Sequence, residues 1–186
     1  MAALDDRRIL VMTTNFGTES DELTKPIAAL REAGATVTVA ATEPGVVKTL
    51  AGDRDPGPEV PVDTTYDQVK AADFDALVLP GGTLNADQLR ADETAQQVAR
   101  AFAADAKPVA AICHAPWLLI DGGLADGRDL TSVPTIRTDL VNAGAHWSDQ
   151  EVVVDDAGGY RLITSRTPED LDAFVAAIRD ALTSEE

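Results

Sequence analysis

The sequence predicts a mixed α/β fold with a mostly parallel sheet and helices on both of its faces. Short, wholly apolar runs at residues 9–12, 76–79 and 109–112 have the length and composition of buried strands. Segments with helical periodicity alternate with these runs, as expected for a parallel sheet with crossover helices. The chain has 186 residues, of which 45% are hydrophobic. We therefore expect one domain over residues 1–186, with a core of its own.

The N-terminal half is expected to contain a strand at 9–12, a helix at 23–33, a strand at 36–40, one or two helical turns at 66–71 and a strand at 76–79. Gly34 is placed to end the first helix. Residues 52–64 are rich in proline, glycine and acidic side chains, so we interpret them as a loop.

The C-terminal half is expected to contain a helix at 92–106, a strand at 109–112, a helix at 114–120, a helix through 140–141, hairpin strands at 151–154 and 160–163, and a helix from 168 to 182. The last helix is the clearest of these. Thr167 is a suitable N-cap and Pro168 fits the first helical position. Apolar residues then follow along one side of the helix.

Charge and composition exclude several classes of partner. The chain has 32 acidic and 15 basic side chains, which gives a formal net charge of -17. Such a surface repels phosphate backbones and anionic lipids, so we expect neither nucleic-acid nor membrane binding. No signal peptide or spanning segment is visible, and the single cysteine cannot form an intramolecular disulfide. These features favour a reducing, cytoplasmic location.

Cofactor and metal sites are not predicted. One cysteine and two histidines at unsuitable spacing do not make a zinc site. No G-x-G-x-x-G follows the first strand, and no Gly-Lys-Ser/Thr follows the Pro-Gly-Gly segment at 80–82.

The strongest candidate for chemistry is Cys113, in the segment V-A-A-I-C-H-A-P-W-L-L-I. A buried strand ends just before it and a helix follows, which puts the thiol where open α/β sheets bind ligands. Unpaired amides at the helix start would lower the pKa of the thiol and favour the thiolate. The alternative is that Cys113 is a small buried hydrophobe. His114 can assist only if a sharp turn brings both side chains together, and His146 is interpreted as structural or exposed.

Two further loops follow predicted strands. L-V-L-P-G-G-T-L-N-A-D, residues 77–87, contains two glycines whose backbone can approach a ligand and donate to an oxyanion. T-T-N-F-G-T-E-S-D-E-L-T-K-P, residues 13–26, contains Glu19 and two further acids. From the residues alone, the start of a solvated helix is the better interpretation of this acidic segment.

Taken together, these loops resemble the PfpI branch of the ThiJ/PfpI superfamily. The similarity rests on E-S-D-E-L-T-K-P, L-V-L-P-G-G and A-I-C-H-A-P, followed by N-A-G-A-H-W-S-D-Q-E-V-V-V-D and L-I-T-S-R-T-P-E-D-L. It covers about residues 7 to 180. The resemblance implies a flavodoxin-like sandwich related to class I glutamine amidotransferases, and a homodimer or larger homo-oligomer.

The resemblance also implies roles for particular residues. Cys113 matches the elbow nucleophile, His114 the neighbour that completes the site, and Glu19 the acid that hydrogen-bonds the sulfur. The amides of Gly82 and His114 match the oxyanion pocket. Asp87 falls near an acid that in some members reaches the histidine of a neighbouring subunit, although the loop here is one residue longer. Ala115 replaces the usual glycine after the histidine.

Activities of this family range from conversion of methylglyoxal and removal of glycation adducts to proteolysis, chaperone holding and oxidative sensing. We expect a cysteine-dependent enzyme that acts on a small carbonyl compound or on a modified protein or peptide, because addition of a thiolate to a dicarbonyl explains several of these activities. An intracellular cysteine peptidase and a non-catalytic redox-sensing or chaperone protein remain the alternatives. A glutamine amidotransferase is disfavoured, since no late His-x-Glu is present.

Overall fold

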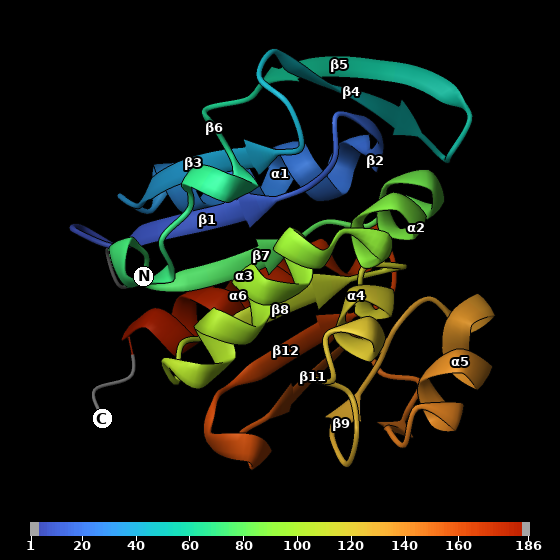
Figure 1. Cartoon of the computed structure of the whole chain (residues 1–186). Helices are drawn as coiled ribbons and strands as arrows, with labels where there is room; N and C mark the ends of the chain where they lie inside the picture. Colours follow the sequence, from blue (N-terminus) through green and yellow to red (C-terminus); the bar gives the residue numbers. More distant parts are fainter. Residues whose placement is uncertain (1–3, 184–186) are drawn as a thin grey trace.

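The computed structural model describes residues 4–183 and is organised around a seven-stranded sheet (Figure 1). The strand order is β11-β12-β8-β7-β1-β3-β6, and every neighbouring pair is parallel except β11 with β12. The strands are β1 (Arg8–Met12), β3 (Thr36–Ala41), β6 (Thr64–Thr65), β7 (Ala76–Leu79), β8 (Val109–Ile112), β11 (Val152–Asp155) and β12 (Leu162–Ser165). The predicted mostly parallel sheet, with helices on both faces, is confirmed.

Helices cover both faces of this sheet. Alternate residues of β1 point to opposite faces, with Ile9 and Val11 in one core cluster and Leu10 and Met12 in the other. The first cluster packs on α1 (Ser20–Glu32) and α6 (Leu171–Thr183), and the second packs on α2 (Thr83–Ala91), α3 (Glu93–Ala104) and α4 (Pro116–Asp121). Figure 1 shows these two layers behind and in front of the sheet.

Smaller elements complete the chain. A two-stranded sheet pairs β9 (Asp129–Leu130) with β10 (His146–Trp147), and α5 (Arg137–Asn142) lies between them in sequence. Short 3-10 helices occur at η1 (Tyr66–Gln68), η2 (Ala71–Asp73), η3 (Pro134–Ile136), η4 (Ala157–Gly159) and η5 (Pro168–Asp170).

The prediction of a loop at residues 52–64 is wrong. β4 (Val46–Ala51) and β5 (Asp55–Pro61) form an antiparallel hairpin, and β2 (Phe16–Glu19) joins β4 in a separate three-stranded sheet. β5 lies at the edge of this sheet and is mostly exposed. An edge strand tolerates prolines and polar residues that a central strand excludes, which is why its composition resembled a loop.

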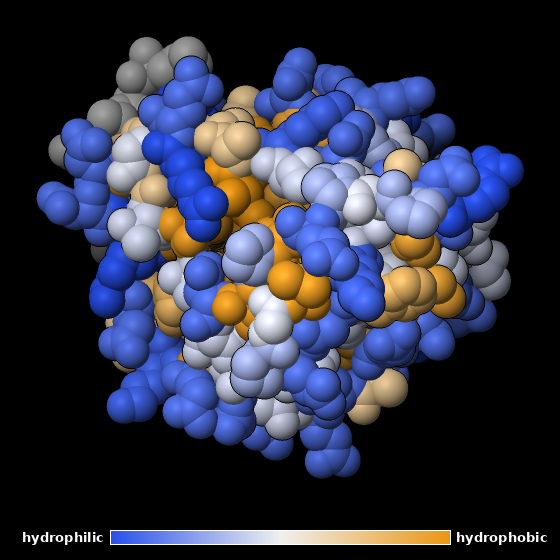
Figure 2. Space-filling model, turned by 90° about the horizontal axis from the view of Figure 1, so that it is seen from above, coloured by the Kyte–Doolittle hydropathy of each residue, from blue (hydrophilic) through white to orange (hydrophobic). Residues whose placement is uncertain are grey.

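Polar side chains cover most of the molecular face in Figure 2, with an apolar area exposed between them. Among the large hydrophobic residues, Phe16, Leu84, Val141 and Val154 are the exposed ones. Within residues 4–183 there is no helix of the length and apolar character that a bilayer crossing requires.

Candidate active site

Cys113 occupies a sharp turn between β8 and α4. Its φ of 64° lies in the left-handed region, which is uncommon for a residue other than glycine. The backbone holds this conformation from both sides: Cys113 N–H donates to Ser165 O at 3.0 Å, and Val133 N–H donates to Cys113 O at 3.1 Å. Strained, over-determined backbone of this kind is concentrated at functional sites. The predicted strand, turn and helix are therefore present, although the helix begins at Pro116 rather than at His114.

Glu22, not Glu19, is the acid beside the sulfur. The Glu22 carboxyl interacts with the Cys113 side chain, and its Oε2 accepts from Gly81 N–H at 2.8 Å. Its Oε1 is buried and has no hydrogen-bond partner among the described residues. Burial raises the pKa of Glu22 to about 8, so the group carries its proton at neutral pH. A neutral carboxylic acid can donate to the sulfur.

The placement of Glu19 corrects the assignment made from the resemblance. Glu19 is the last residue of β2, and its Oε2 accepts from Gly52 N–H at 2.9 Å. It therefore holds the β4–β5 turn instead of touching the cysteine. Helical periodicity could have identified the correct acid: Glu22 lies on the buried stripe of α1 with Pro26 and Leu30, at spacings of four residues.

The Pro-Gly-Gly segment packs against the elbow, as its sequence suggested. The backbone amides of Gly82 and His114 both hydrogen-bond to the Cys113 sulfur. Gly81 has no room for a side chain, because an added Cβ would lie 2.5 Å from Glu22 Oε2 and 2.7 Å from Cys113 Cβ. Two backbone donors thus converge on the position where negative charge would form during a reaction.

The imidazole of His114 also lies close to the sulfur. Its Nδ1 is 3.3 Å from Cys113 Sγ, and its Nε2 is 3.3 Å from Thr83 Oγ1 and 3.4 Å from Thr135 Oγ1. Burial lowers the pKa of His114, while the negative charge of Asp53 opposes this effect. The imidazole is therefore neutral at pH 7 and can accept a proton.

The pKa of the Cys113 thiol is raised, contrary to the lowered pKa expected from the sequence. Burial is the main cause, since the residue is only 8% exposed, and Glu22, once it has lost its proton above about pH 8, acts in the same direction. The amides of Gly82 and His114 act in the opposite direction. Because α4 has only six residues, it adds a small dipole of its own.

The remaining predicted residues lie outside this cluster. Asp87 is on the exposed side of α2 and makes no hydrogen bond or ion pair within residues 4–183. Ala115 is fully buried in the core cluster on the α3 side of the sheet, whereas Cys113 belongs to the opposite cluster. His146 is exposed and lies 3.1 Å from an Asp129 carboxyl oxygen, consistent with a structural or surface residue.

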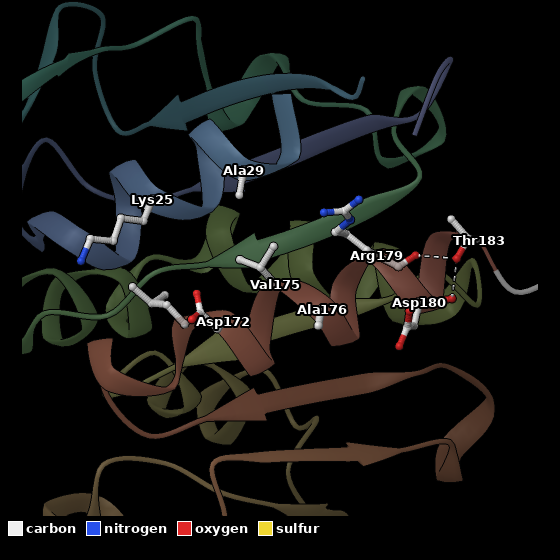
Figure 3. Close-up of a pocket in the computed structure, with 9 residues that line it drawn as sticks. Lys25, Ala29, Asp172, Val175, Ala176, Arg179, Asp180 and Thr183 are labelled. Atoms are coloured by element: carbon white, nitrogen blue, oxygen red, sulfur yellow. Dashed lines mark hydrogen bonds between the residues drawn. The ribbon is translucent and has the colours of Figure 1, made fainter. Parts of the chain in front are cut away.

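In the described part of the chain, no group of three or more His, Cys, Asp or Glu side chains is placed to hold a metal ion. A groove of about 380 Å³ lies between α1 and α6, and Figure 3 shows side chains such as Lys25 and Val175 on its walls. Its lining includes none of the residues around Cys113.

Known proteins are similar to this chain over most of its length. Residues 7–181 match the model of the DJ-1/PfpI family. General stress protein 18 of Bacillus subtilis is 46% identical over 168 residues, covering 90% of this chain and 93% of that protein. Deglycase PH1704 of Pyrococcus horikoshii is 43% identical over 168 residues, covering 90% of this chain and 95% of that protein.

Solved structures share the fold. The crystal structure of Drosophila melanogaster DJ-1beta matches with a TM-score of 0.83 and 34% identity, covering all of this chain and 92% of the other. The family match spans most of the sequence, and the relatives exceed 40% identity over nearly their whole length. This chain belongs to the DJ-1/PfpI family.

Proposed function

We propose that this protein is a stress-related, cysteine-dependent enzyme that acts on reactive carbonyl compounds or on glycation adducts. The observation that carries the proposal is the position of Cys113 on a strained elbow between the Glu22 carboxyl and His114 Nδ1. The names of the relatives, a general stress protein and a deglycase, support the same class of function.

The proposed reaction begins with a protonated thiol, because the pKa of Cys113 is raised. As the sulfur attacks an aldehyde carbon, the thiol proton moves to His114 Nδ1, 3.3 Å away. A bond forms between sulfur and carbon, and the electron pair of the carbonyl moves to its oxygen. That oxygen then takes up a proton, which gives a hemithioacetal.

Backbone amides and Glu22 are proposed to stabilise this step. The N–H groups of Gly82 and His114 already point to the sulfur, where they favour a developing negative charge. Protonated Glu22 adds a third donor without adding negative charge. With methylglyoxal, proton transfer from C1 to C2 and hydrolysis of the resulting thioester would yield lactate and regenerate the thiol.

Consumption of methylglyoxal in the absence of glutathione tests the proposal. We expect Cys113→Ala to reduce the rate to background, and Glu22→Gln to reduce it more than Glu19→Gln, since only Glu22 contacts the sulfur. Equal rates in wild type and Cys113→Ala would reject the proposal. Cleavage of fluorogenic peptides that is blocked by thiol alkylation would instead favour a cysteine peptidase.

A homodimer or larger homo-oligomer is also proposed. Asp87 is exposed and makes no hydrogen bond or ion pair among the described residues, so a catalytic role for it would require a neighbouring subunit. Light scattering would establish the assembly state. A monomer with full activity, or an Asp87→Asn variant with unchanged turnover, would remove Asp87 from the site.

A further inference from the structure

Asp53 and Thr83 connect the β4–β5 hairpin to the imidazole of His114. The backbone N–H of Thr83 donates to Asp53 Oδ1 at 2.8 Å, and its hydroxyl donates to Asp53 Oδ2 at 2.6 Å. The same hydroxyl oxygen lies 3.3 Å from His114 Nε2. A continuous series of contacts therefore runs from a carboxylate, through one hydroxyl, to the ring that faces Cys113.

The direction of these hydrogen bonds determines the tautomer of His114. An ionised carboxylate can only accept, so the single hydroxyl proton of Thr83 is directed to Asp53. The oxygen of Thr83 is then left as an acceptor toward Nε2. The ring consequently carries its proton on Nε2 and presents an unprotonated Nδ1 to the sulfur, 3.3 Å away.

We propose that Asp53 is a positioning residue which, through Thr83, fixes His114 in the Nε2–H tautomer, so that Nδ1 is free to accept the Cys113 proton. This inference rests on the proposed cysteine-dependent function. The series of Cys, His, Thr and Asp comes from three segments of one chain. Asp87 has no part in it. In the series, only Cys113 and His114 touch the reacting atoms.

The local backbone indicates that Asp53 is held in place for this contact. Asp53 has a φ of 56°, and the preceding Gly52 has a φ of 61°. The Glu19 carboxyl accepts from Gly52 N–H and so secures the turn. Asparagine tolerates the left-handed region as well as aspartate does, so Asp53→Asn changes the charge with little strain.

Among residues 4–183, Asp53 is the carboxylate whose charge acts on His114. The Trp117 ring lies 5.3 Å from the imidazole and is itself stacked under Arg90 at 5.2 Å. Thr135 is exposed and can accept from Nε2 as Thr83 does. The Glu22 carboxyl interacts with Cys113 and with the amide of Gly81 instead.

Nitrogen-15 NMR of the two imidazoles tests the inference directly. The chain has only His114 and His146, so exposed His146 is an internal reference. We expect neutral His114 in the wild type to be protonated on Nε2. In Asp53→Asn and Thr83→Val the Nδ1–H form should become substantial, and Thr83→Ser should restore the wild-type pattern. A wild-type His114 protonated on Nδ1, or no change in either variant, would overturn the inference.

The rate of Cys113 alkylation by iodoacetamide gives a second readout. We expect Asp53→Asn to lower this rate about tenfold at pH 7, because the His114 imidazole would no longer be oriented to accept the thiol proton. Asp55→Asn removes an equal charge from the same hairpin, where Asp55 is exposed, and should leave the rate unchanged. Equal losses in both variants would show a general charge effect and refute the positioning role.

These measurements distinguish the positioning role of Asp53 from the proposed enzyme activity. If the wild type consumes no carbonyl substrate while the tautomer and alkylation rate respond to Asp53→Asn as described, the inference stands and the proposed function fails. If carbonyl turnover depends on Cys113 but neither the tautomer nor the alkylation rate responds, the proposed function stands and the inference fails.

Discussion

At the scale of single residues, Glu22 makes the stability of the protein depend on pH. Its pKa is about 8 in the folded protein, above the ordinary value of 4.5. The folded state therefore binds more protons than the unfolded state between these values, and the free energy of unfolding falls as pH rises through this window. Each unit of difference contributes about 1.4 kcal/mol, so the loss amounts to a few kcal/mol.

Urea unfolding of wild type and Glu22→Gln between pH 5 and 9 measures this effect. We expect the slope of stability against pH to be shallower in the variant, which has no proton to lose. Glu19→Gln is the matched control: burial raises the pKa of that carboxyl too, but the group is less buried than Glu22, so its effect on the slope should be smaller. Parallel pH profiles for wild type and Glu22→Gln would show that Glu22 is ionised throughout.

Asn85 is a second residue whose role depends on burial. Its Oδ1 accepts from Thr13 Oγ1 and from both the N–H and Oγ1 of Thr14, and its Nδ2 donates to the carbonyls of Pro80 and Gly81. The side chain is fully buried. It thereby joins the loops that follow β1 and β7, including the loop that carries the amide donors.

We expect Asn85→Ala to destabilise the protein by about 2–4 kcal/mol, because it leaves several buried polar groups without partners. Exposed Asn142 has no comparable contacts, and Asn142→Ala should change stability by less than about 0.5 kcal/mol. Chemical denaturation with an unchanged m-value is the measurement. Similar stabilities for the two variants would contradict the assigned role of Asn85.

What the sequence could predict at residue scale follows the same physics. The positions of Cys113, His114 and Gly82 were predictable because each follows closely after the end of an apolar strand, which is easy to locate. Which acid faces the cysteine depends on where α1 begins. The helix predicted from the sequence begins three residues later than α1 does. Asp53 and Thr83 could not be predicted, since their contact spans 30 residues and depends on a hairpin turn.

At the scale of elements, the apolar strands were predictable and the exposed β4–β5 hairpin was not. β7 and β8 coincide with the apolar runs at 76–79 and 109–112. The hairpin of β4 and β5 could not be predicted, because the exposed edge strand β5 has no apolar pattern. α2 was also missed: it follows Gly82 directly, and its first turn has no acidic residue to mark a helix start.

One buried ion pair connects the β9 segment to the β11–β12 hairpin. Arg128 Nε lies 2.6 Å from Asp155 Oδ2, with side-chain exposures of 5% and 10%. The guanidinium also donates to the carbonyls of Asp155 and Tyr160, and it stacks over the Tyr160 ring at 4.3 Å. Removal of one partner would leave the other buried and unpaired.

We expect Arg128→Ala to lower the free energy of unfolding by about 3–5 kcal/mol. The neighbouring pair Arg161–Asp156 has the same 2.6 Å separation but is solvent-exposed, so Arg161→Ala should cost less than about 1 kcal/mol. The comparison separates burial from hydrogen-bond length. Equal losses in both variants would show that burial of the pair is not the determining factor.

At the scale of the whole molecule, the net charge of -17 sets the response to salt. Mutual repulsion among the excess carboxylates destabilises the compact state, and salt shortens the Debye length from about 30 Å at 0.01 M to about 8 Å at 0.15 M. Exposed ion pairs such as Lys25–Asp21 act in the opposite sense, because salt weakens them. With acids outnumbering bases about two to one, repulsion outweighs these pairs.

We therefore expect the Tm to rise between 0.01 and 0.15 M potassium chloride, by about 2–4 °C for each kcal/mol of relieved repulsion. Most of the increase should occur within this low range, where screening changes most. An increase that appears only above about 1 M would indicate preferential exclusion of salt from the protein surface instead. Sucrose, which has no charge, is the control for that effect. A Tm that falls with added salt would show that attractive ion pairs dominate, contrary to the balance inferred from the sequence.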